Sequence, residues 1–75
     1  MEDYKKRMVL EYAYIKEKYN KLHKLLIKYD AGTLDFELNC PPSLLKEQKR
    51  VMGEYLRILE IRAEMEGVNL ESEGL

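Results

Sequence analysis

Three polar side chains recur every seven residues in the second half of the chain, and their types suit ligand binding. Gln48, Tyr55 and Arg62 fall in one row on a helix. The row runs along the same side as four apolar residues, Val51, Met52, Ile58 and Leu59. An unpaired arginine on a buried face costs several kcal/mol. Either a carboxylate of the chain or a phosphate of a ligand should therefore lie near Arg62.

Two helices are needed to position this row. In the first, apolar residues recur at steps of three and four, which is a helical seam: Met8, Tyr12, Ile15, Tyr19, Leu22, Leu26 and Tyr29. This spacing predicts a helix over about residues 2–30. Gly32 follows it, and glycine suits a left-handed cap because it has no Cβ.

The stretch that follows the first helix changes its period. Leu34, Phe36 and Leu38 alternate with polar residues, which predicts an extended connector over about residues 31–42 with one buried face. Pro41 and Pro42 suit the start of a helix, so a second helix is expected over about residues 43–66, with Gly67 as its cap. Residues 68–75 have few apolar groups, and we expect a loose tail.

An antiparallel hairpin follows from this connector, and it brings the tyrosines of the first helix to the polar row. If Tyr29 faces Leu45, Tyr19 lies opposite Tyr55. The same register puts Tyr12 opposite Arg62, Leu26 opposite Gln48, and Glu11 and Glu66 near the guanidinium; a register that slips by one turn is the open alternative. Two interpretations remain open. Arg62 pairs with one of these carboxylates while the tyrosines pack in the core, or Arg62, Tyr55, Gln48, Tyr12 and Tyr19 line a pocket that clamps a planar or anionic ligand.

A chain of 75 residues forms one domain with a marginal core. Its single cysteine, Cys40, cannot form an internal disulfide, and no Cys/His spacing suggests a metal site. The first helix also carries apolar residues away from its seam, namely Val9, Leu10, Tyr14, Leu25 and Ile27. We therefore expect an all-α hairpin that assembles into a homo-oligomeric helical bundle, a four-helix dimer or a larger ring.

Composition excludes several functional classes. No apolar run approaches the ~20 residues of a membrane span, and the N-terminus does not read as a secretory signal, so a cytosolic, soluble protein is expected. The net charge of -1 argues against general nucleic-acid binding. His23 and Cys40 lie too far apart in sequence to suggest a catalytic dyad, and no phosphate-binding loop or zinc-protease motif occurs. We predict no catalysis and no cofactor.

A second surface suits a protein partner. Lys21, Lys24 and Lys28 form a basic stripe roughly opposite the seam, and such a stripe is a solvated face or a patch for an acidic partner. Leu10, Tyr14 and Leu25 lie beside it. Together these six residues are the alternative binding surface.

Three segments resemble a group of small helical proteins encoded by phages and prophages of Gram-positive bacteria and described as related to a crAss-like phage protein. They are "YKKRMVLEY" from Tyr4 to Tyr12, "NCPPSLLKEQ" from Asn39 to Gln48 and "MGEYLRILEIRAEMEG" from Met52 to Gly67. The second proline of "NCPP" is a minor departure. The resemblance implies a viral protein acting in the cytoplasm of the bacterial host, and small phage proteins of this kind often antagonise bacterial defence. Some are oligomeric helical hairpins that act as sponges for nucleotide immune signals.

Two hypotheses follow, beside the simpler interpretation that this is a structural or regulatory phage protein with neither property. In the first, the oligomer sequesters a cyclic oligonucleotide or an ADP-ribose-type nucleotide, with Arg62 on a phosphate and Tyr55, Tyr12 or Tyr19 stacked on a base. In the second, the protein docks directly on a host defence protein through the alternative surface.

Overall fold

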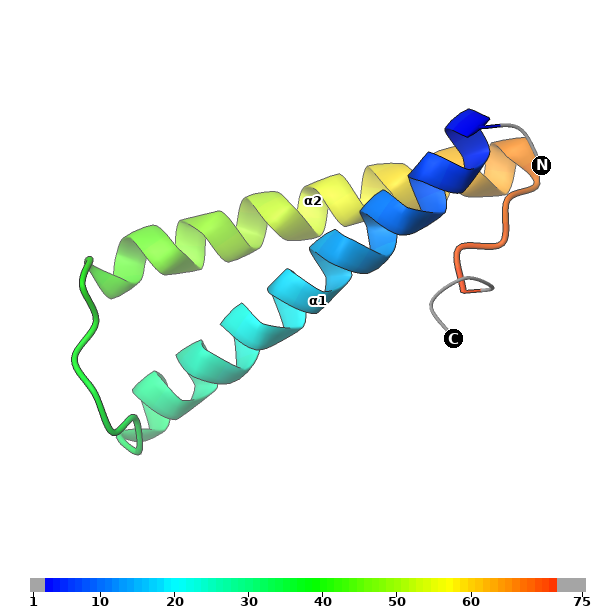
Figure 1. The fold of residues 1–75 in the computed structure, drawn as a ribbon. Coiled ribbons are helices and arrows are strands. Elements are labelled where there is room, and N and C mark those ends of the chain that lie inside the picture. The colour runs from blue at the N-terminus through cyan, green and yellow to red at the C-terminus, as the bar shows by residue number, and fades with distance from the viewer. Residues whose placement is uncertain (1–2, 72–75) are drawn as a thin grey trace.

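The computed structural model describes residues 3–71, which form two helices joined by an irregular connector (Figure 1). Helix α1 spans Asp3–Ala31 and helix α2 spans Pro42–Glu66, and the two pack against each other. No strand occurs within the described residues. The all-α, two-helix architecture expected from the sequence is confirmed.

The helix ends follow from glycine and proline chemistry. After α1, Gly32 adopts a left-handed φ of 77°, and the Thr33 N–H donates to the Lys28 carbonyl at 2.9 Å. After α2, Gly67 has a φ of 68°, and the Val68 N–H donates to the Ala63 carbonyl at 2.8 Å. Both are the six-to-one bonds of a glycine-capped helix end. At the start of α2, Pro41 is the N-cap.

The connector is less buried than its alternating pattern predicts. Leu34 and Leu38 are half-buried, whereas the side chain of Phe36 is 56% exposed. Leu34 and Phe36 line a small hollow with Leu25 and Lys28 of α1. The connector therefore lies beside the end of α1, and the expectation of one continuous buried face was wrong at Phe36.

The core lies in the half of the hairpin that holds both termini. Its buried cluster comprises Met8, Tyr12, Leu56, Leu59 and Ala63. Val68 and Leu70 pack against this cluster from beyond the end of α2. We expected residues 68–75 to be loose, but the first part of the tail extends the core; residues 72–75 lie outside the described part of the chain. The tail does so because the cap at Gly67 turns the chain back toward α1.

Toward the connector the two helices diverge (Figure 1). The radius of gyration is 15.0 Å, whereas a compact chain of this length has a value of about 11 Å. In the connector half of the helices, Leu26 is the one buried side chain among the described residues. The hairpin is thus packed at one end and open at the other.

The helix faces differ from the expected ones at several positions. Tyr29, expected in the seam, is 42% exposed, and Val9, expected outside it, is fully buried. On α2, Val51 and Ile58 are 52% and 48% exposed, because the core side of α2 is centred on Leu56 and Ala63 and its apolar surface is wider than one contact. Leu10, Tyr14 and Ile27 are exposed as expected, whereas Leu25 is half-buried. Neither helix is long and apolar enough to cross a membrane within residues 3–71.

Candidate functional site

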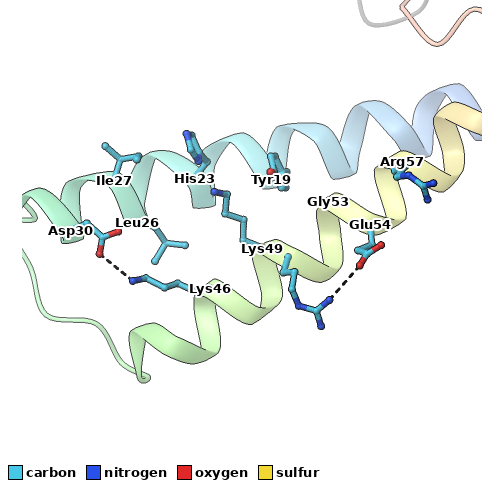
Figure 2. Close-up of a pocket in the computed structure, with 11 residues that line it drawn as sticks. Tyr19, His23, Leu26, Ile27, Asp30, Lys46, Lys49, Gly53, Glu54 and Arg57 are labelled. Atoms are coloured by element: carbon cyan, nitrogen blue, oxygen red, sulfur yellow. Dashed lines mark hydrogen bonds and ion pairs between the residues drawn. The ribbon is translucent and has the colours of Figure 1, made fainter.

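A groove of about 720 Å³ lies between the diverging halves of the helices (Figure 2). This volume falls within the range of small-molecule sites, roughly 300–1,000 Å³. Both helices contribute to its lining, which consists of Tyr19, His23, Leu26, Ile27, Asp30, Lys46, Lys49, Arg50, Gly53, Glu54 and Arg57. The apolar floor and basic rim make this groove the candidate site.

Helical spacing places these residues on facing sides of α1 and α2. On α1, Tyr19, His23 and Leu26 follow each other at steps of four and three. Opposite them, Gly53 lets α2 approach the tyrosine ring: a Cβ at this position would lie 3.3 Å from the Tyr19 Cε1. Because glycine costs helix stability, about 1 kcal/mol relative to alanine, its presence here fits a close approach.

Some charges of the groove are already paired. The Lys46 Nζ lies 3.3 Å from an Asp30 carboxylate oxygen and ties the two helices together at the open end (Figure 2). Arg50 lies 2.5 Å from Glu47 and 3.4 Å from Glu54. Its hydrogen bond holds the pKa of Glu47 below the usual value. These exposed pairs shape the rim and contribute little to stability.

Other nitrogen-bearing side chains of the groove have no carboxylate partner within the described residues. The Lys49 Nζ lies 5.7 Å from the centroid of the Tyr19 ring, and Figure 2 shows its side chain pointing from α2 toward α1. Within residues 3–71, Arg57 and His23 make no hydrogen bond or ion pair, so their donors are available. Lys49 and Arg57 are about 12 Å apart along α2 and lie at different places along the groove (Figure 2). Each can therefore donate to a separate phosphate of one ligand, and a planar ring can stack near Tyr19.

The row of Gln48, Tyr55 and Arg62 lies outside this groove. All three residues are exposed. The Tyr55 hydroxyl donates a hydrogen bond to Glu11, and this bond is the main cause of the raised pKa of Tyr55. Arg62 is close enough to oppose that shift electrostatically. The row is therefore on an outer face of one chain, beside Glu11, and not on the core side.

The tyrosines of α1 do not meet that row. The Tyr12 hydroxyl is part-buried and donates to the Glu60 Oε2 at 2.7 Å. Burial first, and then this bond to a carboxylate, raise the pKa of Tyr12 to about 12. Tyr19 faces Gly53, where Tyr55 was expected. The pairing is thus shifted by two residues from the first expectation, which is less than the one-turn slip that the sequence left open, and the small Gly53 accepts the tyrosine ring.

The alternative surface is split by the connector. Leu10 and Tyr14 are 53% and 60% exposed, and the Lys18 Nζ lies 5.0 Å from the centroid of the Tyr14 ring. Lys21, Lys24 and Lys28 are exposed along the same side of α1, and Lys21 pairs with Glu17 at 3.3 Å. Leu25 instead faces the connector residues Leu34 and Phe36. Five of the six predicted residues thus remain accessible.

Sequence reasoning missed most of the groove. Of the five predicted ligand-binding residues, Tyr19 alone lines it. The signal that could have found it is the basic spacing on α2, where Lys46, Lys49, Arg50 and Arg57 fall on one side of the helix around Gly53. No group of His, Cys, Asp and Glu side chains within the described residues could hold a metal ion.

Comparison with known proteins gives one finding. No curated protein and no solved structure matches the chain. A family model described as Sequestin matches residues 2–65, which is most of the chain. The protein therefore belongs to the Sequestin family.

Proposed function

We propose that this protein is a phage-encoded, non-enzymatic sponge that counteracts a bacterial antiviral defence by sequestering a nucleotide immune signal in the host cytoplasm. The signal is of the cyclic oligonucleotide or ADP-ribose type. The family name indicates sequestration, and it supports a binding role for this chain. The phage origin rests on the resemblance of the three sequence segments described above.

The observation that carries the proposal is the groove between α1 and α2. It combines an aromatic ring, Tyr19, with two cationic groups, Lys49 and Arg57, that have no carboxylate partner among residues 3–71. A nucleotide presents a planar base and an anionic phosphate, and these are the two chemistries that rings and guanidinium groups recognise. The open end of the hairpin admits such a ligand without unpacking the core at the other end.

Titration calorimetry with three probes tests the proposal: ADP-ribose, a cyclic dinucleotide and inorganic phosphate. We expect a nucleotide probe to bind more tightly than phosphate alone, because the ring adds stacking to the charge contact. Arg57→Ala removes a charge-assisted hydrogen bond of about 1.5–3 kcal/mol and should weaken binding by about 10- to 100-fold.

Arg62→Ala is the matched control, since Arg62 is also an exposed arginine of α2 but lies outside the groove. It should leave nucleotide binding unchanged. Loss of binding in Arg62→Ala, with Arg57→Ala intact, would place the ligand on the outer row. If neither nucleotide probe binds the native chain, the proposal fails for these ligand types.

A second candidate function, inhibition of a host defence protein by direct docking, is favoured by the exposure of Leu10 and Tyr14 beside basic residues of α1. Pull-down from a host lysate tests it. A partner retained by the native chain and lost on Tyr14→Asp, from protein that carries no nucleotide, would favour docking.

A further inference from the structure

Helix α2 carries a second apolar seam whose apolar members are largely exposed in the part of the chain that the structure describes. Leu44, Val51, Ile58 and Met65 recur every seven residues and are 58%, 52%, 48% and 82% exposed. Gln48, Tyr55 and Arg62 alternate with them at steps of four and three. We call these seven residues the outer seam.

The outer seam has the spacing of a coiled coil. A repeat of 3.5 residues keeps a stripe facing a partner helix over its whole length, and this stripe holds for three heptads. It runs from residue 44 to residue 65, about 32 Å at 1.5 Å per residue. A stripe of this length and of one helix width fits another helix better than a compact small molecule. At 100° per residue it lies about a third of a turn from Leu56 and Ala63, which face α1.

We propose that the outer seam is a homodimer interface, in which α2 of one chain packs antiparallel against α2 of a second copy. The same seam then supplies both sides of a two-fold contact, as an isologous interface requires. The result is a four-helix assembly with the α2 helices at its centre. It gives the small chain the additional core that one hairpin lacks.

The polar members of the outer seam select the antiparallel orientation. In a parallel pair equivalent residues meet, so Arg62 would face Arg62 of the second copy, with like charges in contact. An antiparallel pair with its axis between residues 55 and 58 packs Tyr55 against Ile58 of the second copy. Arg62 then lies beside Val51 of the second copy. It is also about one helical turn from Glu54 of the second copy, whose carboxylate is an oppositely charged partner for the guanidinium.

This interface leaves the groove open, because Lys49 and Gly53 lie on a different side of α2 from Val51 and Ile58. The inference therefore goes beyond the proposed function and does not depend on it. A dimer that binds no nucleotide would support the interface and count against the sponge, and a nucleotide-binding monomer would do the reverse.

Sedimentation equilibrium of the full chain tests the interface. The native chain should have twice the monomer mass of 8.9 kDa. The double variant Val51→Arg, Ile58→Arg should raise the dimer dissociation constant by at least about 100-fold, because it places a new arginine beside Arg62 of the second copy and two further arginines on either side of the two-fold axis. Leu10→Asp, of similar exposure at 53% but on α1, should leave the dimer intact. A native monomer up to millimolar concentration overturns the proposal, and so does a dimer unaffected by the double variant.

Two further measurements do not depend on a disruptive change. Arg62→Leu replaces a polar seam residue with an apolar one and should tighten the dimer by about 10-fold; a weaker dimer would contradict the seam. A spin label on Met65→Cys in a Cys40→Ser background gives the orientation. The antiparallel pair predicts a separation of about 25–30 Å between labels, whereas a parallel pair gives about 10 Å. The shorter separation overturns the antiparallel arrangement.

Discussion

Tyr12→Phe removes one hydroxyl from the core and tests how the two helices are held together. The ring of Tyr12 is 7% exposed, and its hydroxyl donates to the Glu60 Oε2 at 2.7 Å. Phenylalanine keeps the ring and loses this bond. Other contacts between α1 and α2 stay in place, so the change isolates one polar link between helices.

The structure sets the size of the effect. A hydrogen bond to a charged group contributes about 1.5–3 kcal/mol. Glu60 is exposed and regains water when the bond is lost, so we expect a loss below this range, about 1 kcal/mol at neutral pH.

The raised pKa of Tyr12, from 10.0 to about 12, adds a pH dependence. The group is neutral in both states below the unfolded pKa, where its stabilisation is fully present. As pH rises from 10 to 12 the unfolded state loses its proton first, and the stabilisation is lost. By about pH 11 this loss reaches roughly 1 kcal/mol after allowance for solvent.

Thermal and urea unfolding, followed by circular dichroism, measure both effects. The native chain should be more stable than Tyr12→Phe at neutral pH, and the two stability curves should meet near about pH 11. Comparison with the variant cancels the titration of the other tyrosines, since both chains share them. Equal stability at neutral pH, with parallel curves at alkaline pH, would refute the role assigned to the Tyr12–Glu60 bond.

Two other substitutions, with Leu10→Ala as a control, probe the packed end. Leu59 is fully buried, so Leu59→Ala should cost about 2–5 kcal/mol and abolish a cooperative melt, whereas Leu10→Ala, at a side chain 53% exposed, should change stability by less than about 0.5 kcal/mol. Equal effects would place the core elsewhere. Gly67→Ala places an L side chain at a φ of 68°, and no atom lies within 4 Å of the new Cβ. The loss of stability is therefore conformational, about 1 kcal/mol. An unchanged melting temperature would show that this cap does not hold the helix end.

The helices were predictable because their signals are local. Steps of three and four define α1, and prolines and glycines set the boundaries at Gly32, Pro42 and Gly67. Capping depends on backbone conformations that few residue types adopt. The positions of glycine and proline in the sequence therefore locate the helix ends.

The side of α2 that faces α1 was not predictable in the same way. Its apolar residues cover more than one face, so the hydrophobic pattern permits several rotations. The structure selects the rotation in which Gly53 accepts the Tyr19 ring and Leu59 is fully buried. This rotation depends on how side-chain volumes on the two helices fit together, and the spacing of apolar residues along one helix does not contain that information.

The predicted ligand-binding row lies outside the groove for the same reason. In the observed orientation of α2, Gln48, Tyr55 and Arg62 are on an outer face, whereas Lys49 and Arg57 line the groove. The groove exists because the helices diverge, and no residue pattern in the sequence predicts this divergence. Basic residues around a helical glycine, as in α2, are a signal worth seeking in other short hairpins.

The most direct test is a map of amide chemical-shift changes on the labelled native chain titrated with ADP-ribose and, separately, with a cyclic dinucleotide. We expect one of these probes to shift the amides of residues 19–30 and 46–57, around the groove, and to leave residues 4–10 unchanged. No shifts with either probe, or shifts confined to the surroundings of Arg62 and Glu11, would contradict this expectation.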